Sequence, residues 1–238
     1  MNQPVRILIH GASGRMGQAL SRLAAERDDL QVVGAVSRSK PAQRVVDGIP
    51  QFAAAELHGV PTFDIAIDFS LPEGFDVILA LCVERGVGLV SGTTGLEPVQ
   101  RDAIQRASVR IPLLWAANFS LGVVVLGDLV QRAAAALEKW DCDIVETHHA
   151  NKKDAPSGTA LALGGRAEQE SATPRYASLR AGDVIGEHTV QFTGLGERIE
   201  LIHRATNRDV FARGALHAAA RLAGREPGSY QLRDLFVL

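Results

Sequence analysis

The segment Glu146–Ala160, ETHHANKKDAPSGTA, concentrates side chains that carry protons and positive charge. His148 and His149 are adjacent, and Lys152 follows four residues after His148. A histidine close to its neutral point can deliver a proton, and a neighbouring lysine can hold an anion. The segment is therefore predicted to bind an anionic substrate beside a proton donor. In an extended chain the two histidines point to opposite sides, so one of them at most faces a ligand directly.

The second half of the segment has the pattern of a helix start. Pro156 ends the extended part, and Ser157 is a favourable N-cap residue. Gly158 and Thr159 then present free backbone amides at the helix N-terminus, where a carboxylate binds well. Asp154 can orient a lysine. The predicted ligand is a small molecule with one or two carboxylates.

Two plainer interpretations compete with this one. Adjacent histidines can be metal ligands, but no cysteine or further histidine lies at a suitable short spacing, and the lysines repel a cation. No metal is therefore expected. A lysine pair is often only a solvated surface. The anion site is favoured because a second motif lies elsewhere in the chain.

That motif is HGASGRMG, which places Gly11, Gly14 and Gly17 directly after an apolar strand-like run and at the start of a helical one. In this context Gly11 allows a tight turn, Gly14 lets the backbone approach a pyrophosphate, and Gly17 lets helix and strand pack closely. A dinucleotide site is favoured over a plain strand–helix turn.

The second strand indicates which dinucleotide is bound. An acidic residue at its end would bind a ribose 2′-hydroxyl, but here Ser37, Arg38 and Lys40 stand there, and Asp47 is the first acid. A guanidinium and hydroxyls suit a 2′-phosphate. We expect NADPH to be used at least as well as NADH, with a solvated basic loop as the competing interpretation.

Three further segments lie where strands are expected to end: residues 68–70, 91–95 and 116–120. In a doubly wound sheet, the carboxyl ends of the strands line the ligand crevice. Small residues with free amides and hydroxyls suit a nicotinamide ribose. Residues 116–120 also stand at the expected domain junction, where either a hinge or an ordinary turn fits.

The elements that must position these groups follow from periodicity. Near-continuous apolar runs at residues 5–11, 30–37, 63–70, 86–93 and 111–118 alternate with helical stretches, which predicts a parallel sheet covered on both faces. Residues 40–60 are expected to be a loop with a short helix. After Asn118 come a long helix, a strand, a helix, a hairpin around Gly194–Gly196 and a final amphipathic helix.

The fold class is thus α/β, with a Rossmann-like parallel-sheet cofactor domain and a smaller α+β domain for substrate binding and oligomerisation. We expect the first domain at residues 1–119, the second at 120–205, and a C-terminal return to the first at 206–238.

Composition narrows the class of protein. The chain has 238 residues, a formal net charge of −2 and 46% hydrophobic residues, enough for one large or two modest domains. This charge argues against nucleic-acid binding. The two cysteines are expected to be reduced, and neither a signal peptide nor a membrane-spanning run is recognised. A soluble, cytoplasmic protein with no membrane partner is expected.

Together these stretches resemble the 4-hydroxy-tetrahydrodipicolinate reductase family, also called dihydrodipicolinate reductases. The stretches that carry the resemblance span most of the chain in the family's order: GASGRMG, DFS-P-G, SGTTGL, AANFSLGV, E-HH--K-DAPSGTA and RAGDVIGEHTV. The resemblance implies hydride transfer from NADH or NADPH to a cyclic dicarboxylate imine in diaminopimelate and lysine biosynthesis.

The resemblance also implies residue roles. The proton donor falls on His148, its cationic partner on Lys152, and substrate binding on His149, Ser157, Gly158 and Thr159. Cofactor contacts are expected at the following residues, among which Ser37 and Arg38 are the two discussed above at the end of the second strand: Gly11, Ala12, Ser13, Gly14, Arg15, Met16, Ser37, Arg38, Gly92, Thr93, Thr94, Ala116, Ala117, Asn118 and Phe119.

Members of this family are usually homotetramers assembled through the smaller domain's sheet. Here the stretch between residues 172 and 180 is shorter than in many members, which bears on subunit packing. Two rivals stay open. A related reductase would need a catalytic cysteine or an aspartate/lysine pair, and a non-catalytic NAD(P) sensor would show no turnover.

Overall fold

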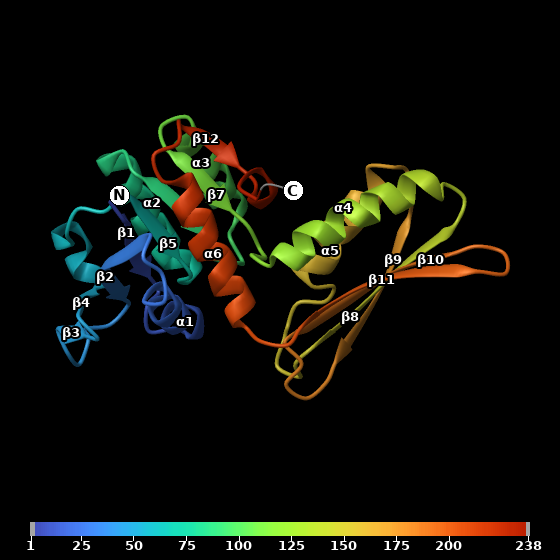
Figure 1. Ribbon diagram of the computed structural model, residues 1–238, viewed down its shortest axis with the longest axis horizontal. Coiled ribbons are helices and arrows are strands. Elements are labelled where there is room, and N and C mark those ends of the chain that lie inside the picture. The colour runs from blue at the N-terminus through green and yellow to red at the C-terminus, as the bar shows by residue number, and fades with distance from the viewer. Residues whose placement is uncertain (1–2, 237–238) are drawn as a thin grey trace. The chain divides into compact units, whose positions relative to one another are not determined.

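The computed structural model describes residues 3–236, and the chain divides into two compact units. The first comprises Met1–Phe119 and Phe211–Leu238, and the second comprises Ser120–Val210. The division thus falls at residue 119, and again at residue 210 rather than at residue 205. Figure 1 shows the elements of each unit.

Unit 1 is built on an eight-stranded sheet in the order β12-β7-β6-β5-β1-β2-β4-β3. Every neighbouring pair is parallel except β3 with β4. The strand order reverses beside β1, as in doubly wound sheets, so the carboxyl ends of β1, β5 and β6 lie next to one another. The strands are β1 (Val5–His10), β2 (Leu30–Ser37), β3 (Val45–Val46), β4 (Ile49–Ala53), β5 (Ile65–Asp68), β6 (Gly88–Ser91), β7 (Pro112–Trp115) and β12 (Gly228–Tyr230).

Helices cover both faces of this sheet, which explains why its strands are apolar throughout. Leu8 and Ala66 of the strands pack with Phe75 and Ile78 of α2 and with Ile104 of α3 in one core. The opposite face carries α1 and α6 (Figure 1), and Arg213 of α6 forms an ion pair with Glu26, which lies two residues after the end of α1. The helices are α1 (Arg15–Ala24), α2 (Pro72–Arg85), α3 (Pro98–Ser108) and α6 (Asp209–Leu222), with short 3-10 turns η1 (Ala54–Gly59) and η2 (Leu232–Asp234).

Unit 2 holds a four-stranded sheet in the order β11-β10-β8-β9. Strand β10 is antiparallel to β11 and β8, whereas β8 and β9 are parallel. Helices α4 and α5 cover one face, where Ile144, Val190 and Phe192 form the core with Leu126 and Leu163 (Figure 1). These elements are α4 (Leu121–Ala136), β8 (Asp141–His148), α5 (Gly158–Glu168), β9 (Pro174–Arg180), β10 (Gly186–Thr193) and β11 (Arg198–Ala205).

The predicted fold class is confirmed, with three local differences. Residues 40–60 contain the strands β3 and β4 in addition to a short helix. The alternation that marks a strand is interrupted there by Pro50, which is tolerated because β3 and β4 form the sheet's edge. Strand β9 occupies the shortened stretch after α5, and β12 extends the sheet with three residues that are too few for a periodic signal.

Within residues 3–236, every helix is too short or too polar to cross a lipid bilayer.

Two neighbouring glycines of α5 give a matched test of the packing in unit 2. A Cβ added at Gly164 would overlap the hydroxyl of Tyr176 on β9, whereas nothing lies within 4 Å of one added at Gly165. Gly164→Ala should lower the free energy of unfolding by about 1–3 kcal/mol, because the rigid Tyr176 ring must move. Gly165→Ala should raise it by roughly 0.5–1 kcal/mol through helix propensity. Chemical denaturation of both variants checks this, and equal effects would contradict the packing described.

Candidate active site

The glycine loop joins β1 to α1 in unit 1. Gly11 has a φ of +82°, and a Cβ there would lie 2.5 Å from the carbonyl oxygen of Phe69. A Cβ at Gly17 would lie 2.5 Å from Cα of Ala12, so α1 packs directly on the turn. Gly14 is the N-cap residue of α1, and its side of the turn is exposed. The glycines therefore keep side-chain bulk low in the turn before the first amides of α1, an arrangement that fits a pyrophosphate.

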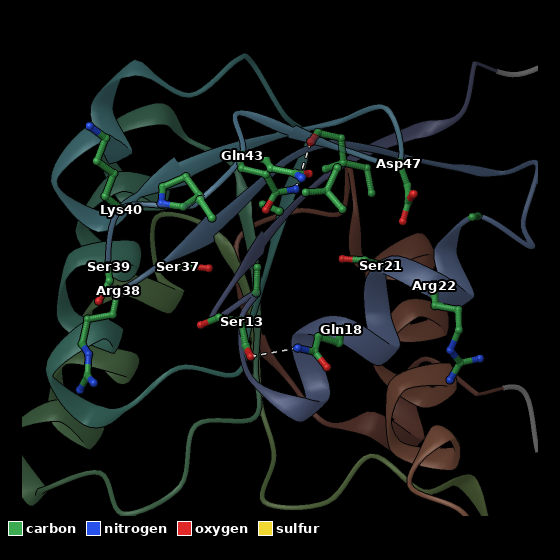
Figure 2. Close-up of a pocket in the computed structure, with 18 residues that line it drawn as sticks. Ser13, Gln18, Ser21, Arg22, Ser37, Arg38, Ser39, Lys40, Gln43 and Asp47 are labelled. Atoms are coloured by element: carbon green, nitrogen blue, oxygen red, sulfur yellow. Dashed lines mark hydrogen bonds between the residues drawn. The ribbon is translucent and has the colours of Figure 1, made fainter.

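A cavity of about 910 Å³ lies beside this loop, between α1 and the segment that follows β2 (Figure 2). Its labelled lining is mainly neutral and polar, with Ser13 and Gln18 joined by a hydrogen bond of 3.3 Å from the Gln18 amide to the Ser13 carbonyl. Ser37 points into the cavity, whereas the side chains of Arg38 and Lys40 extend away from its interior in Figure 2.

Arg38 also lines a second cavity of about 410 Å³, which shares Ser13 of the glycine loop with the first. That cavity has Gly11 and Gly14 on one wall, and Leu71 and Val77 on another. Arg38 thus stands between the two cavities at the end of β2, where the ribose of a dinucleotide is expected.

A buried carboxylate, Asp68, connects the ends of β1, β5 and β6. Asp68 is fully buried, and its oxygens accept hydrogen bonds from His10 Nδ1 at 2.8 Å and from the hydroxyls of Ser91 and Thr93 at 2.8 and 2.7 Å. The backbone amide of Ser70 adds a fourth bond at 3.2 Å. Burial alone would raise the pKa of Asp68, but the bonds from His10 and the hydroxyls outweigh it and lower the pKa. This ionised side chain holds three loop starts together.

The other predicted cofactor residues lie on the turns that follow β6 and β7. Thr93 is buried and its hydroxyl is committed to Asp68, whereas Thr94 is exposed. A Cβ at Gly92 would overlap the ring of Phe69, so the turn approaches that ring closely. Phe119 is buried, with its ring centroid 5.5 Å from that of Phe69. The remaining residues are placed as follows: Arg15, Ala117 and Ser13 exposed, Met16, Ala116 and Asn118 half-buried, and Ala12 buried.

In unit 2, a second buried carboxylate, Glu146, holds His148. Both lie on β8 and point to the face that α4 and α5 cover, because they are two residues apart on a strand. Glu146 is 1% exposed, and its Oε2 accepts a hydrogen bond from His148 Nδ1. Burial would raise the pKa of Glu146, yet hydrogen bonds from Arg180, Ser178 and His148 lower the pKa to about 2. An ionised Glu146 accepts hydrogen bonds only, so the proton of neutral His148 sits on Nδ1 and leaves Nε2 bare.

Charges around His148 oppose one another. Burial lowers the pKa of His148, the bond to Glu146 raises it, and the positive charges of Lys152 and Arg180 lower it, with a net lowering. His188 on β10 packs edge-on against His148, with ring centroids 5.1 Å apart. Burial, reinforced by His148, lowers the pKa of His188 to about 4, so His188 is neutral near pH 7.

Lys152 is partly buried, with 23% of its side chain exposed, and its ammonium lies 2.8 Å from Asp154. Burial would raise the pKa of Asp154, but the hydrogen bond from Lys152 lowers it. His149 is half-buried and follows the end of β8, where the chain leaves the sheet. The loop that carries Lys152 therefore starts at the candidate proton donor.

The predicted helix start is confirmed at α5. Ser157 is the N-cap residue, and its Oγ accepts a hydrogen bond from the backbone amide of Ala160 at 3.2 Å. The same Oγ forms a second hydrogen bond with Nε2 of His188, 3.2 Å away, in which the tautomer of His188 decides which of the two atoms donates. Ser157 is buried with its hydroxyl committed on both sides, so its side chain secures the helix start beside Gly158 and Thr159.

Sequence reasoning missed the roles of Glu146, Arg180, His188 and Asp68. The spacing of Glu146 and His148, two residues apart in an expected strand, was the one signal available for the first. Arg180 and His188 both stand in the stretch RAGDVIGEHTV, which the resemblance includes, but no local pattern shows that they reach the site from other strands of unit 2. Among residues 3–236, no group of three or more histidine, cysteine, aspartate or glutamate side chains could hold a metal ion.

Comparison with protein families matches both halves of the chain. Residues 5–119 match the model described as "Dihydrodipicolinate reductase, N-terminus", and residues 122–236 match "Dihydrodipicolinate reductase, C-terminus".

Curated relatives match over nearly their whole length. A 4-hydroxy-tetrahydrodipicolinate reductase from Stenotrophomonas maltophilia is 71% identical over 237 residues, covering 99% of each chain. The proteins of the same name from Xanthomonas campestris pv. campestris and Xylella fastidiosa are 69% and 62% identical, covering 98% and 100% of each chain.

Solved structures share the fold. A dipicolinate-bound dihydrodipicolinate reductase from Paenisporosarcina sp. TG-14 superposes with a TM-score of 0.80 at 22% identity, covering 96% of this chain and 97% of that one. A myo-inositol dehydrogenase from Corynebacterium glutamicum gives a TM-score of 0.66 at 13% identity, covering 94% and 90%.

The resemblance predicted from GASGRMG, SGTTGL and the histidine–lysine segment is confirmed by these matches, as is the prediction of a pyridine-nucleotide-dependent oxidoreductase. With both halves matched and relatives 62–71% identical over its full length, the chain belongs to the dihydrodipicolinate reductase family.

Proposed function

We propose that the chain reduces the cyclic dicarboxylate imine derived from 4-hydroxy-tetrahydrodipicolinate to tetrahydrodipicolinate, with His148 as the proton donor. Lys152 and the amides at the start of α5, Gly158 and Thr159, bind the carboxylates, and His149 contributes a further contact. The supporting observation is that unit 2 brings His148, the partly buried Lys152 and the N-terminus of α5 to one end of its sheet.

This arrangement suits a small dianion. The ammonium of Lys152 and the partial positive charge of the helix start offer two positive ends, one for each carboxylate. The relative from Paenisporosarcina was solved with dipicolinate, which has the chemistry expected of such a ligand. Binding both carboxylates orients the ring so that the protonated His148, or a water that His148 positions, can supply the proton that completes the reduction.

The cofactor is held by unit 1. The glycine loop of unit 1 fits a dinucleotide. Backbone atoms lie so close to Gly11 and Gly17 that neither position could carry a side chain. The absence of side chains at these two positions helps to leave the first amides of α1 accessible. A bound reduced nicotinamide supplies the hydride. Ser37, Arg38 and Ser13 lie where a ribose 2′-phosphate would sit, so NADPH is used at least as well as NADH.

The chain forms homotetramers through the uncovered face of the unit 2 sheet. A largely apolar row (the apolar row below) crosses the middle of that face, in which Val145 pairs with Thr189 and Ala177, and Thr189 pairs with Ile202. Val145 and Ile202 are 37% and 41% exposed in the single chain. Such a row is self-complementary and would bury apolar area in a symmetric contact. Both cysteines are free and buried, which supports a cytoplasmic enzyme.

Replacing the proton donor should separate chemistry from cofactor binding. His148→Gln should lower kcat by roughly 10²-fold or more while the Kd for NADPH changes little, because cofactor contacts lie in unit 1. The substrate is generated with dihydrodipicolinate synthase, and NADPH oxidation is followed. Equal losses in kcat and in cofactor affinity would show that His148 is merely structural, and no turnover in the parent chain would favour a sensor.

Removing the guanidinium at the end of β2 tests cofactor choice. Arg38→Ala should raise the KM for NADPH by about tenfold and leave the KM for NADH nearly unchanged, because only NADPH has the 2′-phosphate. The coupled assay is run with each cofactor. A parent kcat/KM that favours NADH tenfold or more would refute the NADPH assignment.

A charge placed in the apolar row tests assembly. Val145→Lys should convert the tetramer to smaller species in sedimentation velocity, because an ammonium would be buried at the contact. Val109→Lys is the matched control, since Val109 is 77% exposed at the end of α3 in unit 1. A tetramer that survives Val145→Lys, or a parent chain that sediments as a monomer, would exclude this face.

A further inference from the structure

We propose that the ion pair between Glu146 and Arg180 is the positioning unit of this site: Glu146 fixes the orientation and tautomer of His148, and Arg180 fixes the loop that carries Lys152. The inference rests on the proposed role of His148 as proton donor. Neither residue contacts the substrate, because the Glu146 carboxylate and the Arg180 guanidinium already form their hydrogen bonds within the protein.

All N–H donors of the Arg180 guanidinium are used within the protein. A guanidinium has five N–H donors, and the structure gives Arg180 five acceptors. Nη1 donates to Glu146 Oε2 at 3.0 Å and to the Leu179 carbonyl at 2.6 Å, and Nη2 donates to Glu146 Oε1 at 2.8 Å. Nη2 also donates to the carbonyl of Asp154 at 2.6 Å, and Nε donates to that of Lys152 at 3.3 Å. Arg180 thus has no donor left for a substrate carboxylate.

Two of these acceptors belong to the loop itself. The carbonyls of Lys152 and Asp154 flank Lys153, and the Lys152 ammonium is paired with the Asp154 carboxylate. Because Arg180 stands on β9 and its fork faces Glu146 on β8, the guanidinium ties both ends of this short stretch to the sheet. The position of the Lys152 ammonium therefore depends on the Arg180 guanidinium, which does not itself bind the substrate.

Glu146 accepts hydrogen bonds from both the proton donor and the start of α5. Its two oxygens receive the Arg180 fork, His148 Nδ1 and the backbone amide of Ser157 at 3.3 Å, so one carboxylate joins the proton donor to the start of α5. Glutamine at this position has one acceptor oxygen. The Arg180 fork takes that oxygen, and the amide nitrogen then donates to His148 Nδ1, which moves the neutral ring's proton to Nε2.

The charged groups that face His148 are Glu146 on its own strand, Lys152 and Asp154 on the loop, and Arg180 on β9. His188 on β10 is a further titratable group, which is neutral near pH 7. Glu146 and Asp154 favour the imidazolium, and Lys152 and Arg180 oppose it. Loss of the Glu146 charge therefore lowers the pKa of His148 further, so the proton donor is lost at a lower pH.

Two variants separate the two functions of the pair. Glu146→Gln should lower kcat by roughly 10²-fold, with a smaller change in KM. In the pH profile of this variant, the fall in kcat at high pH should begin at a lower pH than in the parent chain. Arg180→Lys keeps a cation beside Glu146 but not the fork, so it should mainly raise the KM for the dicarboxylate by about tenfold. Glu146→Asp, which keeps the charge, should recover part of kcat.

The matched control is Asp143→Asn. Asp143 and Arg175 form a similar forked pair between the same two strands, at 2.7 and 2.9 Å, on the uncovered face of the sheet. Loss of that pair should leave kcat and its pH profile unchanged. Unchanged Kd for NADPH in all four variants confirms that unit 1 is intact.

Nitrogen NMR of ¹⁵N-histidine-labelled protein reads the tautomer directly, with His148 assigned by its absence from His148→Gln. In the parent chain at neutral pH the proton should be on Nδ1, and in Glu146→Gln on Nε2. A parent His148 protonated on Nε2, or a Glu146→Gln variant with parental kcat and pH profile, would overturn the inference.

If His148→Gln keeps full kcat, the proposed function of His148 fails, while the NMR result still decides whether Glu146 holds the ring. If Glu146→Gln does not fold, the parent spectrum and Arg180→Lys decide.

Discussion

A carboxylate can be buried only when hydrogen bonds replace the water it loses, and each unit of this chain is organised around one such group. Asp68 is fully buried and Glu146 is 1% exposed, yet the pKa of each is lowered despite burial, because the donors around it outweigh desolvation. Each acid draws its donors from several elements at once. The result is a point at which the ends of several strands are held together.

The two acids differ in what they hold. Asp68 gathers hydroxyls and a histidine from strand ends, so it fixes backbone turns that present amides and small residues. Glu146 gathers a titratable ring and a guanidinium, so it fixes side chains that carry charge. This difference matches the two tasks of the proposed enzyme: a dinucleotide is bound largely by backbone, whereas a dicarboxylate and a proton need charged groups.

Local sequence patterns predicted the parts of the site that depend on neighbours in the chain. The tight turn at Gly11, the close packing at Gly17 and the N-cap at Ser157 each follow from the conformational demands of one turn, and the structure shows all three. Strand β4 was missed because its alternation is broken by Pro50. The role of Arg180 was missed because this residue joins Glu146 through the pairing of β8 with β9, which the motif RAGD does not reveal by itself. Long-range pairing, which sets this part of the site, leaves no periodic signal.

The charge balance around His148 couples substrate binding to protonation. With the site as described, burial and two cations hold the imidazole neutral, and Glu146 limits how far its pKa falls. In the proposed function, a dicarboxylate bound by Lys152 and the start of α5 would add two negative charges, which would offset those cations and favour the imidazolium. By linkage, the same interaction makes the dianion bind more tightly as pH falls through the pKa of His148. In the proposed enzyme, substrate binding would thus favour uptake of the proton by His148, the group that must donate it.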